Sequence, residues 1–390
     1  MITVDEARAR LLQLVTRGPV EKVPVAQAAG RVLGADVTAT RDQPPFAASS
    51  MDGYAVHSDE VERHAMFKII GEAAAGKRFS GSVQPGQAVR IFTGAPMPAG
   101  ADFVVIQEDV SRKGDVITIT ETPGTKSNVR PAGVDFTVGT KLSAPRLLMP
   151  ADIALLAAMN IAQVPVTRKP VVALIATGDE LVMPGEDPGP EQIIASNTFG
   201  LRAMLQADGA EVRMLPIARD TEASLRTAFG LAAGADLVVT VGGASVGDHD
   251  LVAPVAEALG LERSFYKIRM RPGKPLMAGR MGDAAMVGLP GNPVSALVCG
   301  HLFLRPMVRR MLGLDPGPPP PKNAALAAPI GGNGAREHYM RAHVQDGRIT
   351  IFDNQDSSLL SVLAASNALV VRPPDDPARA AGDMVSYLAI

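Results

Sequence analysis

The sequence has very little cysteine, no tryptophan and few aromatic residues of any kind. Its 390 residues include one cysteine and no tryptophan, and aromatic residues make up 4% of the chain. A single cysteine, Cys299, excludes an internal disulfide and is typical of proteins from a reducing compartment. Because Cys299 lies within an apolar segment, we predict that it is buried and has no catalytic role.

The sequence also has no excess of either charge and no long hydrophobic run. It carries 38 basic and 40 acidic residues, a formal net charge of −2, so we expect neither nucleic acid nor an anionic membrane as a partner. No apolar run reaches the length of a membrane-spanning helix. The first fifteen residues, MITVDEARARLLQLV, contain charges throughout and predict a helix rather than a secretory signal. The sequence therefore predicts a cytoplasmic protein.

Glycine and proline, in contrast, are abundant. The chain has 38 glycines and 32 prolines, with 46% hydrophobic residues. This composition favours a globular protein with many turns and several modules, and the length predicts two or three domains.

Residues 44–140 predict a small, mostly β module. Short β runs at 89–93, 103–106 and 116–120 alternate with glycine and proline clusters. Asp52-Gly53 is a tight-turn dipeptide and predicts a hairpin. Two loops, 93–102 and 126–135, are unusually polar, and they include Thr93, Arg130 and Asp135. By themselves, these loops are explained more simply as surface turns with solvated charges.

From residue 171 to 313 the pattern changes to alternating strands and helices, which predicts a doubly wound α/β domain. We expect its strands at 171–176, 212–217, 237–241, 265–268 and 285–287. Loops at the carboxyl ends of parallel strands meet at one edge of such a sheet, where ligands bind. The unusual residues of this region follow the expected strands, at Thr177–Glu180, Asp220, Gly242–Asp250, Arg271–Lys274 and Pro290–Ser295.

The loop after strand 237–241 contains Gly242-Gly243 and Gly247, followed by Asp248 and Asp250. A glycine loop that opens a helix is typical of phosphate binding, whereas acids at that place require a divalent cation such as Mg²⁺. One such loop is equally well explained as an ordinary turn with helix-capping aspartates. Five unusual loops at one edge favour a functional site. Its candidate metal ligands are Glu180, Asp220 and Asp250, and its candidate anion ligands are Lys267, Arg271 and Lys274.

The proline-rich segment 315–322 predicts a stiff linker. Beyond it, strands expected at 349–352, 368–372 and 384–388, with a turn at Asp346-Gly347, predict a small β barrel. We expect its basic side chains to lie on the surface and to bind no metal, namely those of Arg336, His338, Arg341 and His343.

Seven motifs in this order make the sequence similar to the molybdopterin molybdenumtransferase family, which includes bacterial MoeA and the E domain of gephyrin. They are PPFAASSMDGYAV, FTGAPMPAGAD, NVRPAGVDF, ATGDEL, VTVGGASVGDHD, MRPGKP and GLPGNPVSA. The resemblance implies a multidomain, elongated homodimer of α/β and β parts. It implies a scaffold region (1–43 and 141–169, its first helix packing on the α/β domain), an inserted, mostly β module (44–140), an α/β molybdopterin-binding domain (170–314) and a C-terminal β-barrel domain (323–390).

The resemblance also implies a reaction, in which molybdate is inserted into adenylylated molybdopterin. A Mg²⁺-dependent cleavage of the phosphoanhydride then gives molybdenum cofactor and AMP. The implied partners are a second copy of the chain, which shares a composite active site, and the molybdopterin adenylyltransferase. Two alternatives are an adenylyltransferase-like enzyme, which should lack the β module and the barrel, and a gephyrin-like binding scaffold, for which the sequence offers no long disordered linker.

The residues that match the family's functional positions fall into two groups, the first of which includes the metal ligands. The catalytic group is Asp52, Asp135, Glu180, Asp220, Asp250, Lys267, Arg271 and Lys274. Within this group the metal ligands are Glu180, Asp220 and Asp250. The substrate-binding group is Thr93, Arg130, Gly242, Gly243, Ser245, Gly247, Pro275, Pro290, Asn292, Pro293, Ser295, Arg336 and Ser357.

Overall fold

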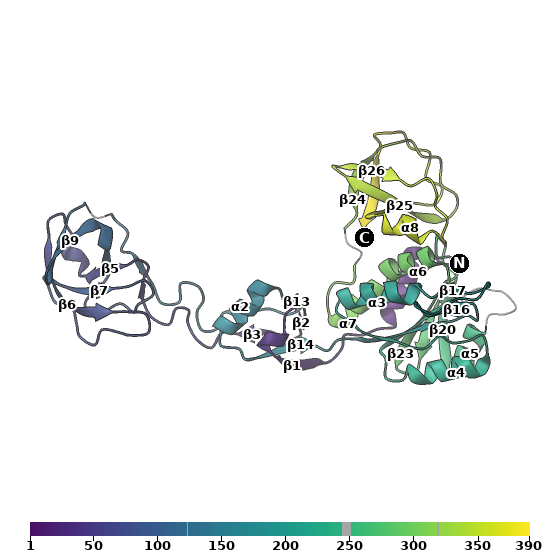
Figure 1. Ribbon diagram of the computed structural model, residues 1–390, viewed down its shortest axis with the longest axis horizontal. Coiled ribbons are helices and arrows are strands. Elements are labelled where there is room, and N and C mark those ends of the chain that lie inside the picture. Colours follow the sequence, from purple (N-terminus) through teal and green to yellow (C-terminus); the bar gives the residue numbers. More distant parts are fainter. Residues whose placement is uncertain (123, 244–250, 318–319) are drawn as a thin grey trace.

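The computed structural model describes residues 1–122, 124–243, 251–317 and 320–390. The chain is elongated (Figure 1), with a β module at one end and, at the other, an α/β domain beside a β barrel. A small sheet with one helix lies between these two ends. Within the described residues, no helix is both long and apolar enough to cross a membrane.

The first helix, α1 (Val4–Gln13), begins with a capping box in which Thr3 and Glu6 bond each other's backbone N–H groups. Its buried residues Val4, Ala7 and Leu11 belong to the same apolar core as the α/β domain. The chain then enters the middle region, a four-stranded sheet of order β1-β14-β2-β13. Its elements are β1 (Val20–Pro24), β2 (Val32–Leu33), α2 (Pro150–Ala158), β13 (Arg146–Leu147) and β14 (Gln163–Thr167).

The β module is built on a six-stranded sheet of order β8-β5-β7-β6-β10-β9. Its strands are β5 (Gly53–Val56), β6 (Met66–Ala73), β7 (Gln87–Ile91), β8 (Phe103–Ile106), β9 (Val110–Lys113) and β10 (Val116–Ile119). The sequence analysis missed β6, and its hairpin at Asp52-Gly53 is wrong. Gly53 instead begins the strand between β7 and β8, where a Cβ would lie 2.1 Å from the carbonyl oxygen of Val105.

Two short ribbons connect the β module to the middle region. They pair β3 (Val37–Thr38) with β12 (Lys141–Leu142), and β4 (Ala48–Ser49) with β11 (Val129–Arg130). The segment that enters the module and the segment that returns from it are therefore hydrogen-bonded to each other.

The α/β domain has a six-stranded sheet of order β18-β15-β19-β23-β22-β20. Its strands are β15 (Val171–Ala176), β18 (Glu211–Met214), β19 (Leu237–Val241), β20 (Leu261–Tyr266), β22 (Met277–Met281) and β23 (Ala284–Leu289). Beside it lies a short pair, β16 (Leu181–Val182) and β17 (Ile193–Ile194). The sequence analysis missed β22, which runs antiparallel to both of its neighbours and makes the sheet mixed rather than wholly parallel.

Helices cover both faces of this sheet, so the prediction of a doubly wound α/β domain is confirmed. One face packs against α3 (Asn197–Ala207), α6 (Pro293–Cys299), η4 (Gly300–Leu304) and α7 (Arg305–Leu312). The other packs against α4 (Glu222–Leu231) and α5 (Val252–Ala258). β20 runs in the same direction as β23, because each is antiparallel to β22. The loop after β20 therefore emerges at the same edge as the loops after the parallel strands.

The C-terminal part is a closed β barrel, as predicted. Its strands are β24 (Lys322–Leu326), β25 (Glu337–Gln345), β26 (Arg348–Ile351), β27 (Ala368–Arg372) and β28 (Met384–Ala389), with α8 (Leu360–Ala364) beside them. β25 pairs with both β26 and β27 and so closes the barrel. A short strand of the α/β domain, β21 (Met270–Arg271), joins β25 in parallel and links the two parts.

The prediction that the basic side chains of the barrel lie on its surface is wrong for two of them. His338 is 8% exposed and Arg341 is 1% exposed, whereas Arg336 and His343 are exposed. Burial lowers the pKa of His338 to about 4, with a further contribution from nearby arginines, so its imidazole is neutral at pH 7. His338 and Arg341 are three residues apart and therefore lie on opposite faces of β25, so both faces of this part of the strand are covered.

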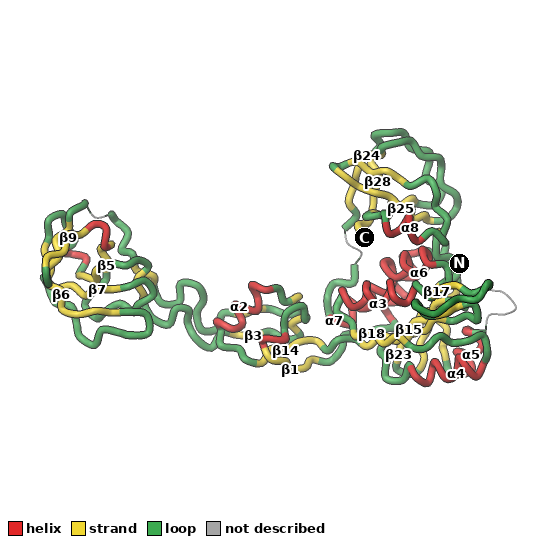
Figure 2. Tube along the Cα trace, in the orientation of Figure 1, coloured by secondary structure: helices red, strands yellow, loops and turns green. Residues whose placement is uncertain are grey.

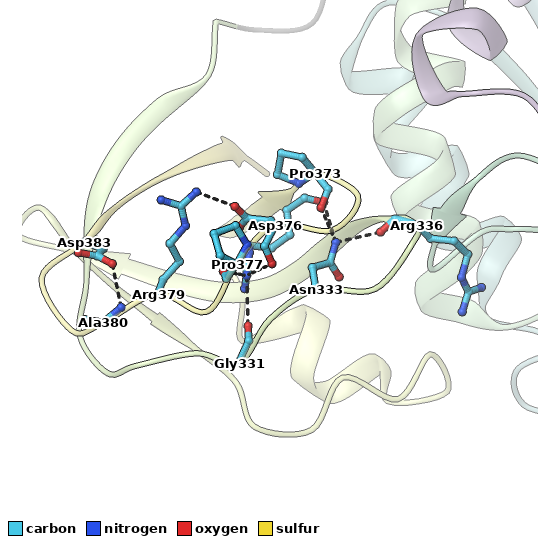
Figure 3. A network of polar contacts seen from close by, with 10 residues as sticks. Gly331, Asn333, Arg336, Pro373, Asp376, Pro377, Arg379, Ala380 and Asp383 are labelled. Atoms are coloured by element: carbon cyan, nitrogen blue, oxygen red, sulfur yellow. Dashed lines mark hydrogen bonds and ion pairs between the residues drawn. The ribbon is translucent and has the colours of Figure 1, made fainter.

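A second buried arginine, Arg372, anchors the loop after β27. It forms an ion pair with Asp376 and donates to the carbonyl oxygen of Pro377 at 2.7 Å. Arg379 donates to the other carboxylate oxygen of Asp376 at 2.6 Å, and Figure 3 shows the network around this carboxylate. Asn333 donates to the carbonyl oxygen of Arg336 at 2.9 Å, and the Arg336 side chain points away from the network (Figure 3).

We predict that Asp376→Asn destabilises the barrel by about 3 kcal/mol, because it leaves the buried Arg372 without its counter-ion. Asp375→Asn is the matched control, since Asp375 is exposed and adjacent in sequence. Hydrogen exchange of barrel peptides in the full chain measures the difference, and equal protection in the two variants would contradict the prediction.

The same network predicts a pH dependence. Burial by itself would raise the pKa of Asp376, but hydrogen bonds from Arg379 and Arg372 outweigh it and lower the pKa. A lowered folded-state pKa stabilises the barrel above about pH 4, and this stabilisation is lost as the pH falls through the folded-state value. The barrel of Asp376→Asn should therefore lose less protection than the wild-type barrel as the pH falls below about 4.

Candidate functional site

A pocket of about 720 Å³ lies at the carboxyl edge of the α/β sheet. Its walls come from loops that follow β15, β19 and β23, from the β16–β17 pair, from the start of α3 and from the barrel. The lining residues are Ala176, Thr177, Gly178, Glu180, Leu181, Ile193, Ile194, Ala195, Ser196, Asn197, Thr198, Asp220, Val241, Gly242, Gly243, Pro275, Pro290, Gly291, Asn292, Pro293 and Ser358.

Eight of the predicted site residues line this pocket. They are Glu180, Asp220, Gly242, Gly243, Pro275, Pro290, Asn292 and Pro293. The loops that the strand-end argument selected thus meet around one cavity. The predicted residues Ser245, Gly247 and Asp250 lie outside the described residues.

Two glycines allow the backbone to pass closely at the pocket floor. Gly178 has φ +144°, and a Cβ there would lie 2.2 Å from Oε2 of Glu180. Gly242 has φ +103°, and its Cβ would lie 2.5 Å from the carbonyl oxygen of Thr177. Both positions therefore need glycine. A side chain at Gly178 would displace the Glu180 carboxylate, and one at Gly242 would push its loop away from the loop that contains Thr177.

Arg219 holds the loop that carries Glu180. Its Nη1 donates to the carbonyl oxygens of Asp179 and Leu181, each at 3.0 Å. The backbone N–H of Asp220 donates to Oδ1 of Asp179 at 3.1 Å. These bonds join the ends of β15 and β18 and bring the carboxylates of Glu180 and Asp220 to the same pocket.

The start of α3 contributes residues that the sequence analysis did not include among the site residues. Ser196, Asn197 and Thr198 line the pocket, and Nδ2 of Asn197 donates to the carbonyl oxygen of Gly291 at 2.7 Å. A helix N-terminus presents unpaired N–H groups and a positive dipole end to an anion. The Ser196-Asn197 pair is a usable signal in the sequence, because serine and asparagine are common where a helix begins.

The barrel meets the pocket at Ser357 and Ser358. Nδ2 of Asn292 donates to Oγ of Ser357 at 2.9 Å, and the backbone N–H of Val294 donates to its carbonyl oxygen at 3.1 Å. Ser358 lines the pocket itself. Segments about 65 residues apart in sequence thus form one rim.

None of the predicted cations Lys267, Arg271, Lys274 and Arg336 is among the residues that line the pocket. Arg271 pairs through β21 with His338 of β25, and Lys274 is exposed. Lys267 has φ +73°, and its Nζ lies 5.2 Å from the ring centroid of Tyr266. Arg336 is exposed at the start of β25. Ser295 is 4% exposed within α6 and faces the core rather than the pocket.

The remaining predicted residues, Asp52, Thr93, Arg130 and Asp135, belong to segment 44–140, whose β module lies at the other end of the chain from the α/β domain (Figure 2). The backbone N–H and Oγ1 of Thr93 both donate to Oδ1 of Asp52 at 2.8 Å. The backbone bond is the largest of the contributions that lower the pKa of Asp52. Arg130 lies in β11, and the backbone N–H of Asp135 donates to the carbonyl oxygen of Gln43 at 3.0 Å.

Cys299 is fully buried in α6, and burial raises the pKa of its thiol to about 12. A thiol with this pKa is protonated at neutral pH and is a poor nucleophile. The prediction that Cys299 is a buried residue of the core is confirmed.

Three family models match the chain in succession. They are the MoeA N-terminal region (domain I and II) at residues 2–160, a probable molybdopterin-binding domain at 173–310 and the MoeA C-terminal region (domain IV) at 323–390. The molybdopterin molybdenumtransferase of Nostoc is 37% identical, covering 90% of this chain and 85% of the relative. The Haemophilus influenzae enzyme of the same name is 34% identical, covering 99% and 98%.

The chain belongs to the molybdopterin molybdenumtransferase family. A crystal structure of the molybdopterin biosynthesis MoeA protein from Pyrococcus horikoshii is similar over 100% of this chain and 99% of that one, with a TM-score of 0.88 and 29% identity. A crystal structure of a molybdopterin biosynthesis MoeA protein from Pyrococcus horikoshii OT3 gives a TM-score of 0.84 and 27% identity, with 100% of both chains covered. The family resemblance seen in the sequence is confirmed.

We predict that Gly242→Ala lowers the stability of this molybdenumtransferase by about 2 kcal/mol, through a positive φ and a backbone clash. Gly234→Ala is the matched control, because Gly234 also has a positive φ (+77°) but has nothing within 4 Å of the added Cβ. Thermal unfolding of both variants separates the clash from the φ strain. Equal losses of stability would mean that the close approach to Thr177 is unimportant.

Proposed function

We propose that this molybdopterin molybdenumtransferase, an enzyme of molybdenum cofactor biosynthesis, carries out its reaction in the pocket at the carboxyl edge of the α/β sheet. We infer that the substrates are adenylylated molybdopterin and molybdate, and that the phosphoanhydride is cleaved as molybdenum is transferred, with release of AMP. The observation that carries this proposal is the meeting of two carboxylates, a double glycine and a helix N-terminus in one pocket.

The donor set of the pocket fits Mg²⁺. Glu180 and Asp220 supply carboxylates, the ligands that Mg²⁺ prefers together with phosphate oxygens and water. Asp250, the third proposed ligand, lies outside the described residues. Within the described ranges, no group of three acidic, histidine or cysteine side chains could hold a metal alone. When bound, Mg²⁺ would neutralise the charge of the phosphoanhydride and polarise its phosphorus.

The protein's own groups would bind and orient the substrate. The backbone N–H groups at Gly242 and Gly243 and the start of α3 suit the phosphates. The cations Lys267, Arg271 and Lys274 would balance the charge that remains. We propose that the molybdate oxyanion is bound with the help of loop and barrel residues, namely Pro275, Ser295, Arg336 and Ser357. Ser295 would contribute through the position of α6, the helix that contains it.

In this proposal, a second subunit contributes part of the active site, namely its residues Asp52, Thr93, Arg130 and Asp135. The β module that carries Asp52 and Thr93 lies at the opposite end of the elongated chain from the α/β domain (Figure 1), and Arg130 and Asp135 lie in the segment that leads back from it. A homodimer in which the module of one copy covers the pocket of its partner would complete the site. Contact with the molybdopterin adenylyltransferase would let the adenylylated substrate pass directly to this pocket.

The alternative functions are less well supported. An adenylyltransferase-like enzyme needs neither a β module nor a barrel, and both are present here. No observation in the described residues favours a gephyrin-like receptor scaffold over an enzyme.

We predict that Glu180→Gln lowers the rate of AMP release at least about 100-fold and weakens the apparent affinity for Mg²⁺, because it removes one of two described carboxylates at the pocket. Glu186→Gln is the control, since Glu186 is exposed in the same β16–β17 segment and does not line the pocket. AMP release is measured while Mg²⁺ is titrated. Full activity in excess chelator would refute the metal proposal.

We predict that a mixed dimer restores activity. Asp52→Asn and Glu180→Gln chains carrying different tags are co-expressed, and the doubly tagged dimer is isolated. In a composite site, one of the two sites carries both lesions and the other carries none, so about half of the wild-type activity should return. If each site lies within one chain, every site keeps one lesion and the mixed dimer stays inactive.

A further inference from the structure

Asp52 and Thr93 form a hydrogen-bonded pair at one end of the β-module sheet. The backbone N–H and Oγ1 of Thr93 both donate to Oδ1 of Asp52 at 2.8 Å. Among the described residues, these are the hydrogen bonds that the carboxylate accepts, and both end on the same oxygen. Asp52 is half-buried, and its second oxygen, Oδ2, is therefore available to accept a hydrogen bond from a ligand.

The backbone at Asp52 is held by the two strands that flank β5. The carbonyl oxygen of Asp52 accepts a bond from the backbone N–H of Gln107, directly after β8, at 3.0 Å. The next carbonyl oxygen, that of Gly53, accepts a bond from Nη1 of Arg90 in β7 at 3.2 Å. Nη2 of Arg90 donates to Oε1 of Gln107 at 2.6 Å and so connects the two flanking strands to each other.

Two aromatic rings fix the position of the Arg90 side chain. Arg90 is the residue opposite Tyr54 where β7 pairs with β5, and its Cζ lies 5.0 Å from the centroid of the Tyr54 ring. Cζ lies 4.7 Å from the ring centroid of Phe92, the residue before Thr93. A guanidinium within about 6 Å of an aromatic ring is attracted to the ring face. The side chain of Arg90 is therefore fixed by both rings as well as by its hydrogen bonds.

The positive charge of Arg90 acts on Asp52. Within the described part of the chain Arg90 forms no ion pair, because its bonds end on a carbonyl oxygen and an amide oxygen, both of them neutral. The backbone and side-chain bonds from Thr93 lower the pKa of Asp52, and the charge of Arg90 lowers it further. The carboxyl group of Asp52 is consequently ionised at neutral pH and accepts hydrogen bonds without donating any.

We propose that Arg90 is a positioning residue, which fixes the carboxylate of Asp52 so that Oδ2 accepts a hydrogen bond from the adenylylated pterin substrate. This inference rests on the proposed function, in which Asp52 contributes to the pocket of a second copy. Arg90 acts on the backbone through the carbonyl oxygen of Gly53 and through Gln107, and it acts on the carboxylate through its charge. Arg90 itself does not contact the substrate.

A second hydrogen-bonded carboxylate in the same module provides the control. The backbone N–H and Oγ of Ser58 donate to the two carboxylate oxygens of Asp102, each at 2.7 Å. The side-chain bond from Ser58 is the largest contribution that lowers the pKa of Asp102. Ser58→Ala removes this bond and leaves the hydrogen bonds of Arg90 in place.

The test compares Arg90→Met with Ser58→Ala in the full chain, labelled with carbon-13 at the aspartate carboxyl groups. In Arg90→Met we expect the pKa of Asp52 to rise while that of Asp102 stays the same, and Ser58→Ala should give the reverse. Amide exchange at Thr93, whose N–H donates to Asp52, should become faster in Arg90→Met alone. The kcat/KM for AMP release should fall about tenfold in Arg90→Met and stay unchanged in Ser58→Ala.

Arg90→Lys serves as a second variant in case Arg90→Met does not fold. Lysine keeps the positive charge but lacks the planar fork that bonds Gly53 and Gln107 together. The pKa of Asp52 should therefore remain lowered in Arg90→Lys. Amide exchange at Thr93 and kcat/KM should change in the same direction as in Arg90→Met, but by less.

The outcomes separate this inference from the function on which it rests. Unchanged exchange at Thr93 in a folded Arg90→Met or Arg90→Lys protein would overturn the positioning role. Faster exchange with unchanged kcat/KM would overturn it too, because the reaction would then not depend on how Asp52 is held. An equal loss of kcat/KM in Ser58→Ala would attribute the effect to module stability and so contradict the inference. Absence of AMP release in the wild type would refute the proposed function, whereas carboxyl titration and amide exchange do not depend on turnover.

Discussion

The register of three buried parallel strands is the constraint on which the site depends. Ala176 at the end of β15 pairs with Val241 at the end of β19, and Val241 pairs with Leu289 at the end of β23. Because the three strands end level with one another, the loops that follow them begin at one height above the sheet. Substitutions that shift this register would therefore move the Glu180 loop, the double glycine and the Pro290 loop relative to each other.

This constraint also explains how much of the site could be predicted from the sequence. Continuous apolar runs such as Leu237–Val241 indicate buried parallel strands, and the polar loops after them then share one edge. The argument needs only the order of strands and loops, so its conclusion that the polar loops share one edge holds even though β22 was not predicted. It even extends to the loop after β20, because two antiparallel pairings return that strand to the common direction.

What the sequence could not supply is contact between distant segments. Gly53 carries a turn signal, yet its use is to let β5 pass close to Val105, which no local pattern reveals. Arg341 and His338 read as polar and therefore exposed, but barrel closure between β25 and β27 buries them. Ser357 meets Asn292 only after the barrel packs on the α/β domain. In each case tertiary structure overrides a local preference.

The connection to the β module decides how the polar cluster of Asp52 and Thr93 can be used. Outgoing and returning segments are bonded at several levels, from Ala39 with Thr140 to Gln43 with Phe136, and β3 pairs with β12. Folding the module back onto the pocket of the same chain would break these bonds and expose their polar groups in the bend, each at a cost of about 1 kcal/mol or more. A two-stranded arm of this kind is better suited to extend than to fold back. Its stiffness therefore supports the proposal that Asp52 and Thr93 lie at the pocket of a second copy. In such a composite site, the length of the arm, rather than the module's own surface, would set the geometry.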